Sequence, residues 1–218
     1  VTLLLVMACQ SPQSTSVLAP NSEIIAPLSY ADYSDEDQKV LSKCDVDKDE
    51  FNRLMSLNFR DFDQDFKGGW RAISYKDDCN NAASYILKSY LVRSQITFDS
   101  NRSTMLWHTG QVLAGADKYD EAISYFKQSY KTEDNQKEWN LYVDGTIAFL
   151  KGDKDALIEA RDTLAAFSVP EKIKESRRKF LRDNPEITMP EGFIDEPQNL
   201  TPLNRLINCF GQSYSEAY

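Results

Sequence analysis

His108 is the only imidazole in this 218-residue chain, so a catalytic centre built on histidine would have to use it. Serine and cysteine hydrolases pair such a base with a nucleophile held on a sharp turn, and the sequence contains no G-x-S-x-G or comparable turn. We therefore interpret His108 as a packing or hydrogen-bonding residue. The 34 acidic residues would suffice for glycoside chemistry, but no spacing singles out a pair.

The run Asp45-Val46-Asp47-Lys48-Asp49 begins like a calcium-binding loop. Its sixth position, which needs glycine, is Glu50, and its twelfth, which needs a bidentate glutamate, is Ser56. These acids fit the first turn of a helix better, where carboxylates accept from free backbone N–H groups. Three more aspartates alternate along the chain, which would spread them around a helix: Asp61, Asp63 and Asp65. We expect no metal and no cofactor.

The first residues are typical of an exported protein. Residues 3–8 form an apolar run that is too short to span a bilayer and stops at Cys9. The run Val6-Met7-Ala8-Cys9 resembles a bacterial lipobox, which implies cleavage before Cys9 and a diacylglycerol on its thiol. Residues 10–21 have the Ser-, Pro- and Gln-rich composition of a tether. With Gln10 after the cysteine, the resemblance implies the periplasmic face of the outer membrane, or else the periplasm. A buried N-terminal strand is the alternative.

Export would expose the other cysteines to an oxidising compartment, in which disulfides persist. Cys44, Cys79 and Cys209 have no C-x-x-C spacing. With one histidine and a lipidated Cys9, the chain lacks the ligands for a structural zinc site. We expect a disulfide between Cys44 and Cys79, which would close a 35-residue loop and stabilise the fold by about 3–4 kcal/mol. Three reduced, buried thiols are the alternative.

Composition and charge limit the classes of protein to which this chain could belong. Hydrophobic residues make up 41% of the chain, which is enough for a packed core, and the formal net charge is −9. The longest basic cluster is Arg177-Arg178-Lys179. Nucleic-acid binding depends on a basic stripe that releases counterions, so we expect no nucleic-acid partner.

Helical periodicity dominates the chain from about residue 34. Apolar residues recur at helical spacing after Asp47, up to Gly68-Gly69. Further helices are expected over residues 70–75, 80–93, 104–116, 120–130, 137–151, 154–166 and 171–182. Four prolines predict an irregular segment over residues 184–202, and a short helix over 203–210 should end at Gly211. No stretch alternates as a strand would, so we expect no sheet.

Residues 103–167 resemble two helical hairpins of the tetratricopeptide type. Gly110 and Gly145 lie 35 residues apart, where the first helix of each hairpin needs a small residue. Tyr119, Ala122 and Phe126 match the turn and the contacts of the second helix. The resemblance implies a solenoid of stacked helix pairs. Residues 139–150 and 209–218 also resemble a group of uncharacterised bacterial exported proteins, which implies no particular activity.

In tetratricopeptide arrays the first helix of each hairpin lines a concave binding face. The resemblance therefore implies a binding groove made of Trp107, Gln111, Trp139, Tyr142 and Thr146. Aromatic residues with polar neighbours suit a protein or peptide ligand. In the alternative, neighbouring helices or the proline-rich segment cover these residues and make them part of the core.

The sequence thus predicts an all-α protein with a signal remnant at residues 1–9, a flexible tether at 10–33 and a helical domain at 34–218. We expect a non-enzymatic interaction or scaffold lipoprotein of the bacterial envelope. Its partner would be a protein or peptide, and its membrane contact would be made only through lipidated Cys9. One alternative is an envelope hydrolase that uses acidic residues, with the repeats as docking elements. Another is a subunit whose groove holds its own tail or a second copy.

Overall fold

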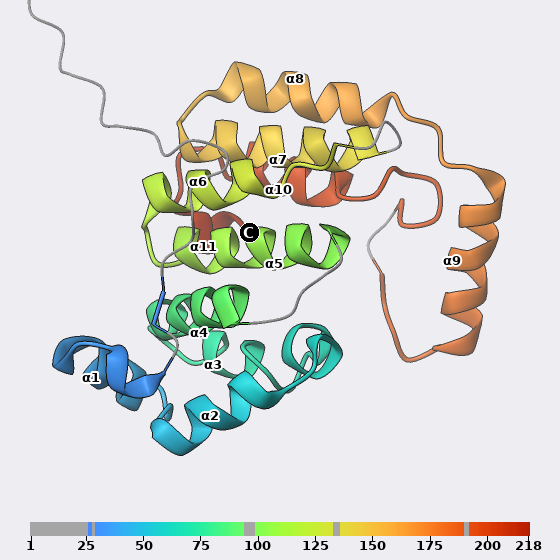
Figure 1. The fold of residues 1–218 in the computed structure, drawn as a ribbon. Helices are drawn as coiled ribbons and strands as arrows, with labels where there is room; N and C mark the ends of the chain where they lie inside the picture. Colours follow the sequence, from blue (N-terminus) through green and yellow to red (C-terminus); the bar gives the residue numbers. More distant parts are fainter. Residues whose placement is uncertain (1–25, 28, 94–98, 133–135, 190–191) are drawn as a thin grey trace, which may run out of the picture.

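The structure is a computed structural model that describes residues 26–27, 29–93, 99–132, 136–189 and 192–218. Across these ranges every regular element is a helix, which confirms the all-α fold class (Figure 1). Cys9, the expected signal remnant and most of the expected tether lie outside the described residues. No helix within these ranges combines the length and the apolar composition needed to cross a bilayer.

The folded part begins before residue 34. A short helix, η1 (Tyr30–Asp32), precedes Tyr33, whose side chain is buried. The Tyr33 hydroxyl donates to the backbone oxygen of Tyr85 at 3.0 Å and lies 2.6 Å from the Ser89 hydroxyl. The expectation of a tether extending to residue 33 is therefore wrong at its C-terminal end, because these contacts hold Tyr33 in the core.

Five elements form the N-terminal half: α1 (Asp35–Lys43), α2 (Lys48–Ser56), the π-helix η2 (Arg60–Gln64), α3 (Arg71–Ser74) and α4 (Asn80–Arg93). The Asp47 side chain caps α2 by accepting from the backbone N–H groups of Asp49 and Glu50, which confirms the capping interpretation. The expected continuous helix up to Gly68-Gly69 is wrong. The chain turns after α2, and Gly69 takes a φ of +54°, where an added Cβ would lie 1.9 Å from the Phe62 carbonyl oxygen.

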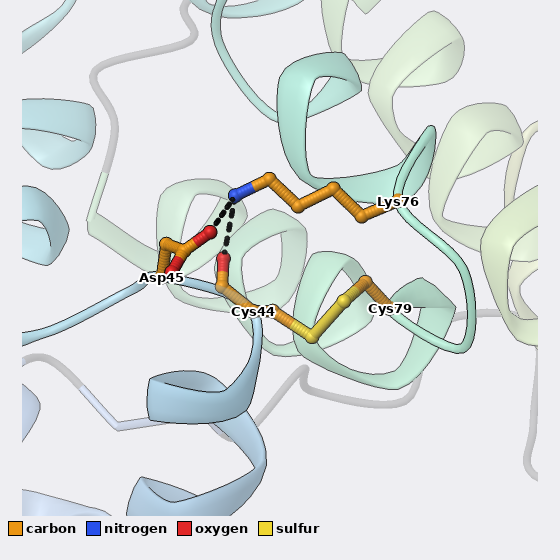
Figure 2. Close-up of a disulfide and its surroundings, with 4 residues drawn as sticks. All are labelled: Cys44, Asp45, Lys76 and Cys79. Atoms are coloured by element: carbon orange, nitrogen blue, oxygen red, sulfur yellow. Dashed lines mark hydrogen bonds and ion pairs between the residues drawn. A yellow bond between two sulfur atoms is a disulfide. The ribbon is translucent and has the colours of Figure 1, made fainter.

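A disulfide between Cys44 and Cys79 joins the end of α1 to the start of α4 (Figure 2). The two Cα atoms are 5.8 Å apart, and both residues are buried. Lys76 lies beside the bridge, where its ammonium group donates to the Cys44 carbonyl oxygen at 3.0 Å and to the Asp45 carboxylate at 2.7 Å. The covalent link and the polar contacts thus fasten the N-terminal helices to α4. Cys209 is a free, partly buried thiol.

Two helix pairs make up the centre: α5 (Asp99–Ala114) with α6 (Tyr119–Gln128), and α7 (Lys137–Leu150) with α8 (Lys154–Ala165). The helices of each pair pack closely. A Cβ added at Gly110 of α5 would lie 2.6 Å from the Phe126 ring on α6, so only glycine permits this approach. The pairs stack on α4, as Figure 1 shows.

Three further helices follow: α9 (Glu171–Asp183), α10 (Leu200–Asn208) and α11 (Tyr214–Ala217). Helix α10 packs on α7 and α8, whereas α9 stands to one side of the stack (Figure 1). Helix α10 begins three residues earlier than expected and includes Pro202, which a first helical turn tolerates because its N–H groups lack intrahelical acceptors. Helix α11 has no counterpart among the expected helices.

Candidate functional site

The predicted groove residues come together where α5 faces α7. The ring centroids of Trp107 and Tyr142 are 4.4 Å apart. Trp139 meets Trp107 edge-on at 5.4 Å, and its indole N–H donates to the Ser129 carbonyl oxygen at 2.9 Å. The aromatic residues therefore form one cluster. We call the surface of α5 and α7 that carries it the α5/α7 face.

This face is covered, as the alternative in which neighbouring segments make these residues part of the core predicts. Trp107 is 3% exposed, Tyr142 2% and Thr146 fully buried. The Thr146 hydroxyl donates to the carbonyl oxygen of Tyr142 within its own helix, so it is not offered to a ligand. Gln111 and Trp139 remain partly exposed. In this structure a ligand could reach the aromatic cluster only by replacing what covers it.

Residues 209–218 supply part of the cover. The hydroxyl of Tyr218 is hydrogen-bonded to that of Tyr142. The backbone N–H of Tyr214 donates to the Tyr119 hydroxyl at 3.2 Å. Phe149 of α7 packs edge-on against both Phe210 and Tyr214, with ring centroids 6.0 and 6.4 Å away. The segment is therefore held on the α5/α7 face by ring contacts and by hydrogen bonds at both ends of α11.

Helix α10 supplies the rest and is held by a different set of contacts. It buries three leucines with helical spacing: Leu200, Leu203 and Leu206. Leu203 lies against Gly145, where an added Cβ would be 2.7 Å from its Cδ2. Arg161 of α8 also donates to the Asn204 side chain at 3.1 Å. Gly145 thus provides the space into which the segment inserts its central leucine.

One polar group in the covered face is poorly satisfied. Tyr214 is 3% exposed, and its hydroxyl makes no well-formed hydrogen bond among the described residues, although the Gln111 side chain lies near enough to lower its pKa. Burial raises the pKa of Tyr214 well above its usual value, and the neighbouring Tyr218 adds to the rise. Leaving a buried hydroxyl unpaired costs about 1–3 kcal/mol. Burial of the Tyr214 hydroxyl therefore destabilises the fold, and a phenylalanine at this position would avoid that cost.

A second polar centre joins η2 to α5. The fully buried carboxylate of Asp63 lies 2.6 Å from His108 Nδ1 and accepts from the Trp70 indole N–H at 2.9 Å. Arg71 Nη2 lies 3.4 Å from His108 Nε2, and its Nη1 is 3.9 Å from the carboxylate. Both ring nitrogens of His108 are therefore engaged, as a hydrogen-bonding interpretation of this residue predicts.

Asp63 remains ionised despite its burial. Desolvation raises its pKa, but the hydrogen bond and electrostatic interaction with His108, the hydrogen bond from the Trp70 indole and the charge of Arg71 together hold the pKa below the ordinary value. The carboxylate is enclosed by donors and does not face a second acid. Across the described residues, no three His, Cys, Asp or Glu side chains converge as metal ligands would. This centre therefore connects η2 to α5 through a buried carboxylate.

Three parts of these sites were not identified from the sequence. Asp63 was placed in an alternating acidic run, with no sign that it meets a histidine 45 residues away. Tyr119 was assigned only to a turn. The tail was named only as one alternative occupant of the groove, although the leucine spacing and the pair Tyr214 and Tyr218, four residues apart, signal two amphipathic turns in residues 200–218. Comparisons with protein-family models, curated proteins and solved structures found no match for this chain.

Proposed function

We propose that this chain is a non-enzymatic interaction protein of the bacterial envelope that binds a segment of a partner protein on its α5/α7 face. One observation carries the proposal: this face already holds a short segment of polypeptide, residues 209–218, through ring contacts and hydrogen bonds. A face that accepts one amphipathic segment has the shape and chemistry to accept another. Peptide recognition by helix-in-groove packing uses the same contacts.

The proposed architecture is a short array of the tetratricopeptide type. In support, Gly110 and Gly145 occupy equivalent places in α5 and α7, and each lies close to an apolar side chain of a neighbouring helix. Phe126 meets Gly110, and Leu203 meets Gly145. On this proposal α10 stacks on the second pair as the next helix of the array would, and α11 lies along the concave side.

The segment that fills the face is suited to exchange. It keeps a buried hydroxyl unpaired at Tyr214, while Tyr218 remains 36% exposed at its edge. A partner segment with phenylalanine or leucine in the place of Tyr214 would avoid the desolvation cost of that hydroxyl. The chain's own C-terminal segment nevertheless competes well with a partner segment because it is covalently attached. Tethering by a flexible linker gives an effective concentration in the millimolar range. The favoured ligand is therefore an amphipathic segment with apolar side chains at helical spacing.

The proposed location is the periplasmic face of the outer membrane, with lipidated Cys9 as the membrane contact. The disulfide between Cys44 and Cys79 supports an oxidising compartment. Metabolic labelling with palmitate tests the anchor. Wild type should incorporate label and fractionate with membranes, whereas Cys9→Ser should do neither. Equal labelling of the two would refute the anchor and leave the binding proposal standing.

A photo-crosslinking residue placed at Gln111 tests the binding site in cells, because Gln111 is partly exposed beside Tyr214 and Tyr218. We expect two products: an internal crosslink to residues 214–218, and a crosslink to one partner protein that grows as the internal one declines. The same photo-residue at Glu159, on the exposed side of α8, serves as the control. Exclusively internal crosslinks at position 111 would mean that the face is a structural contact.

The hydrolase alternative has less support. The most strongly engaged carboxylate, Asp63, is fully buried among donors, and His108 contacts Arg71 with its second nitrogen. The groups that would have to perform acid–base chemistry are thus already paired with one another.

A further inference from the structure

A long connection joins α8 and α10, although these two helices pack against each other. Arg161 lies one turn before the end of α8, Asn204 lies one turn after the start of α10, and their side chains are 3.1 Å apart. Residues 166–199 connect these ends, although helix–helix connections usually need about 2–8 residues. Figure 1 shows α9 standing away from the stack. We call residues 166–199 the α9 arm.

The α9 arm is held mainly by contacts within itself. Arg177 donates to the carbonyl oxygens of Phe193 at 2.9 Å and Glu196 at 2.7 Å, and Lys174 pairs with Asp195 at 2.8 Å. No residue of α9 is buried. The arm therefore adds little to the core, and substitutions on its outer side should leave the fold intact.

One side of α9 is amphipathic, and its apolar stripe borders the arm's own loop, where the Phe180 ring lies 6.5 Å from that of Phe193. Ile173 and Phe180 are 44% and 40% exposed, and they lie seven residues apart, close to two helical turns, on one stripe. Lys172 and Lys179 lie on a flanking stripe with the same spacing. Lys174, which pairs with the acidic loop of the arm, projects from the opposite flank. A large apolar side chain just beyond the helix, Ile187, is also 38% exposed.

The charge of α9 opposes that of the whole chain. The helix carries six Lys or Arg residues and three acids, which gives it a net charge of +3 in a chain of −9. Lys172 and Arg182 have no acidic partner within the described part of the chain. Exposed charges are screened over about 8 Å at physiological ionic strength. Residues 166–199 as a whole carry these six bases and seven acids, but Asp195 pairs with Lys174 on the flank opposite Lys172 and Lys179. The flank that bears Lys172 and Lys179 can therefore present its cations to a surface.

We propose that the α9 arm is a contact site for an anionic phospholipid surface. Ile173 and Phe180 enter the interface between headgroups and acyl chains, and the flanking cations meet lipid phosphates. A short helix with this arrangement lies in the plane of the interface, and its affinity combines buried apolar area with attraction to anionic lipid. The inference is independent of the binding function of the α5/α7 face. It is also independent of Cys9, although an anchor there would hold the arm near a bilayer.

Vesicle co-sedimentation tests the proposal with the full chain carrying Cys9→Ser, so that no acyl chain contributes. The vesicles contain phosphatidylcholine alone or mixed with phosphatidylglycerol. We expect binding to the mixed vesicles only, and weaker binding as salt is raised. The double variant K172Q/K179Q should bind about 30-fold more weakly at low salt, since each cation near an anionic surface contributes about 1 kcal/mol. The double variant I173S/F180S should lose binding.

Matched controls remove similar groups elsewhere. K39Q/K43Q removes two exposed cations from α1, and Tyr75→Ser removes a side chain that is 67% exposed. Both should bind mixed vesicles as the parent chain does, and circular dichroism should show unchanged helix content for all variants. The proposal is overturned if the parent chain ignores phosphatidylglycerol vesicles, as an arm made for a protein partner would. It is equally overturned if the arm variants bind as well as the controls.

Discussion

The hydroxyl groups of Tyr142 and Tyr218 are hydrogen-bonded to each other, although 76 residues separate them in the chain. Tyr142 is almost fully buried on α7, and Tyr218 lies at the edge of the segment that covers the α5/α7 face. Burial raises the pKa of Tyr142 well above its usual value, and Tyr218 adds to the rise. The pair joins a preformed helical face to the segment that occupies it.

Substitutions at Tyr142 separate packing from hydrogen bonding. Tyr142→Ala should lower the free energy of unfolding by about 3–5 kcal/mol, because it removes a buried ring that contacts Trp107. Tyr142→Phe keeps the ring and should cost about 1 kcal/mol. Urea denaturation followed by circular dichroism measures both values. A Tyr142→Ala chain as stable as wild type would show that the ring is not a packing residue.

Removing the hydroxyl of Tyr214 should have the opposite effect from removing that of Tyr142, since the buried Tyr214 hydroxyl makes no well-formed hydrogen bond among the described residues. Tyr214→Phe should raise the free energy of unfolding by about 1 kcal/mol, because the unpaired group is removed while the ring contact with Phe149 remains. Thermal melting of the two chains in the same buffer checks this. A clear loss of stability would mean that the hydroxyl does have a partner.

The disulfide should account for a measurable part of the stability. Replacing Cys44 and Cys79 with alanine should lower the free energy of unfolding by about 3–4 kcal/mol, the loop-entropy value for 35 residues. Cys209→Ser is the matched control, because Cys209 is free and partly exposed, and it should change little. Equal stability of the double variant and wild type under non-reducing conditions would contradict this account.

The lowered pKa of Asp63 predicts how the stability of the fold depends on pH. Its folded pKa lies below the ordinary value of 3.8, so its ionised form stabilises the fold above that pH. This contribution is lost as the pH falls through the folded pKa. At pH 7, Asp63→Asn should cost about 3 kcal/mol, because Arg71 loses its buried counter-charge and His108 loses its charged acceptor. The difference between wild type and variant should stay constant from pH 7 to 5 and shrink below about pH 4. A difference that grows on acidification would contradict the assignment.

Local patterns in the sequence predicted most helices, since caps such as Asp47 and the 3.6-residue periodicity depend on nearby residues only. The close approach at Gly110 and the adjacency of Trp107 and Tyr142 were predictable because the hairpin spacing fixes both. The burial of Tyr142 was not predictable from local patterns, because this residue is in contact with Tyr218, 76 residues further along the chain. The pairing of Asp63 with His108 was missed for a similar reason: only the packing of η2 against α5 brings the two together.

The most direct test of the account is whether residues 200–218 behave as a separable ligand of the α5/α7 face. A protease site inserted after Thr188, an exposed position in the α9 arm, would allow the folded chain to be cut without removing any native residue. The cut chain is then mixed with a fluorescent peptide of residues 197–218, and exchange is followed by fluorescence anisotropy. Gly145→Ala provides the matched variant, because its added Cβ would meet Leu203 of the peptide.

We predict that the released fragment stays bound after cleavage and that excess labelled peptide replaces it. The peptide should bind the Gly145→Ala chain about tenfold more weakly, the effect of an overpacking strain of about 1.4 kcal/mol. A cut chain that remains folded but never exchanges its fragment would contradict the account. Residues 200–218 would then be a permanent part of the core, and the α5/α7 face would have no ligand to bind.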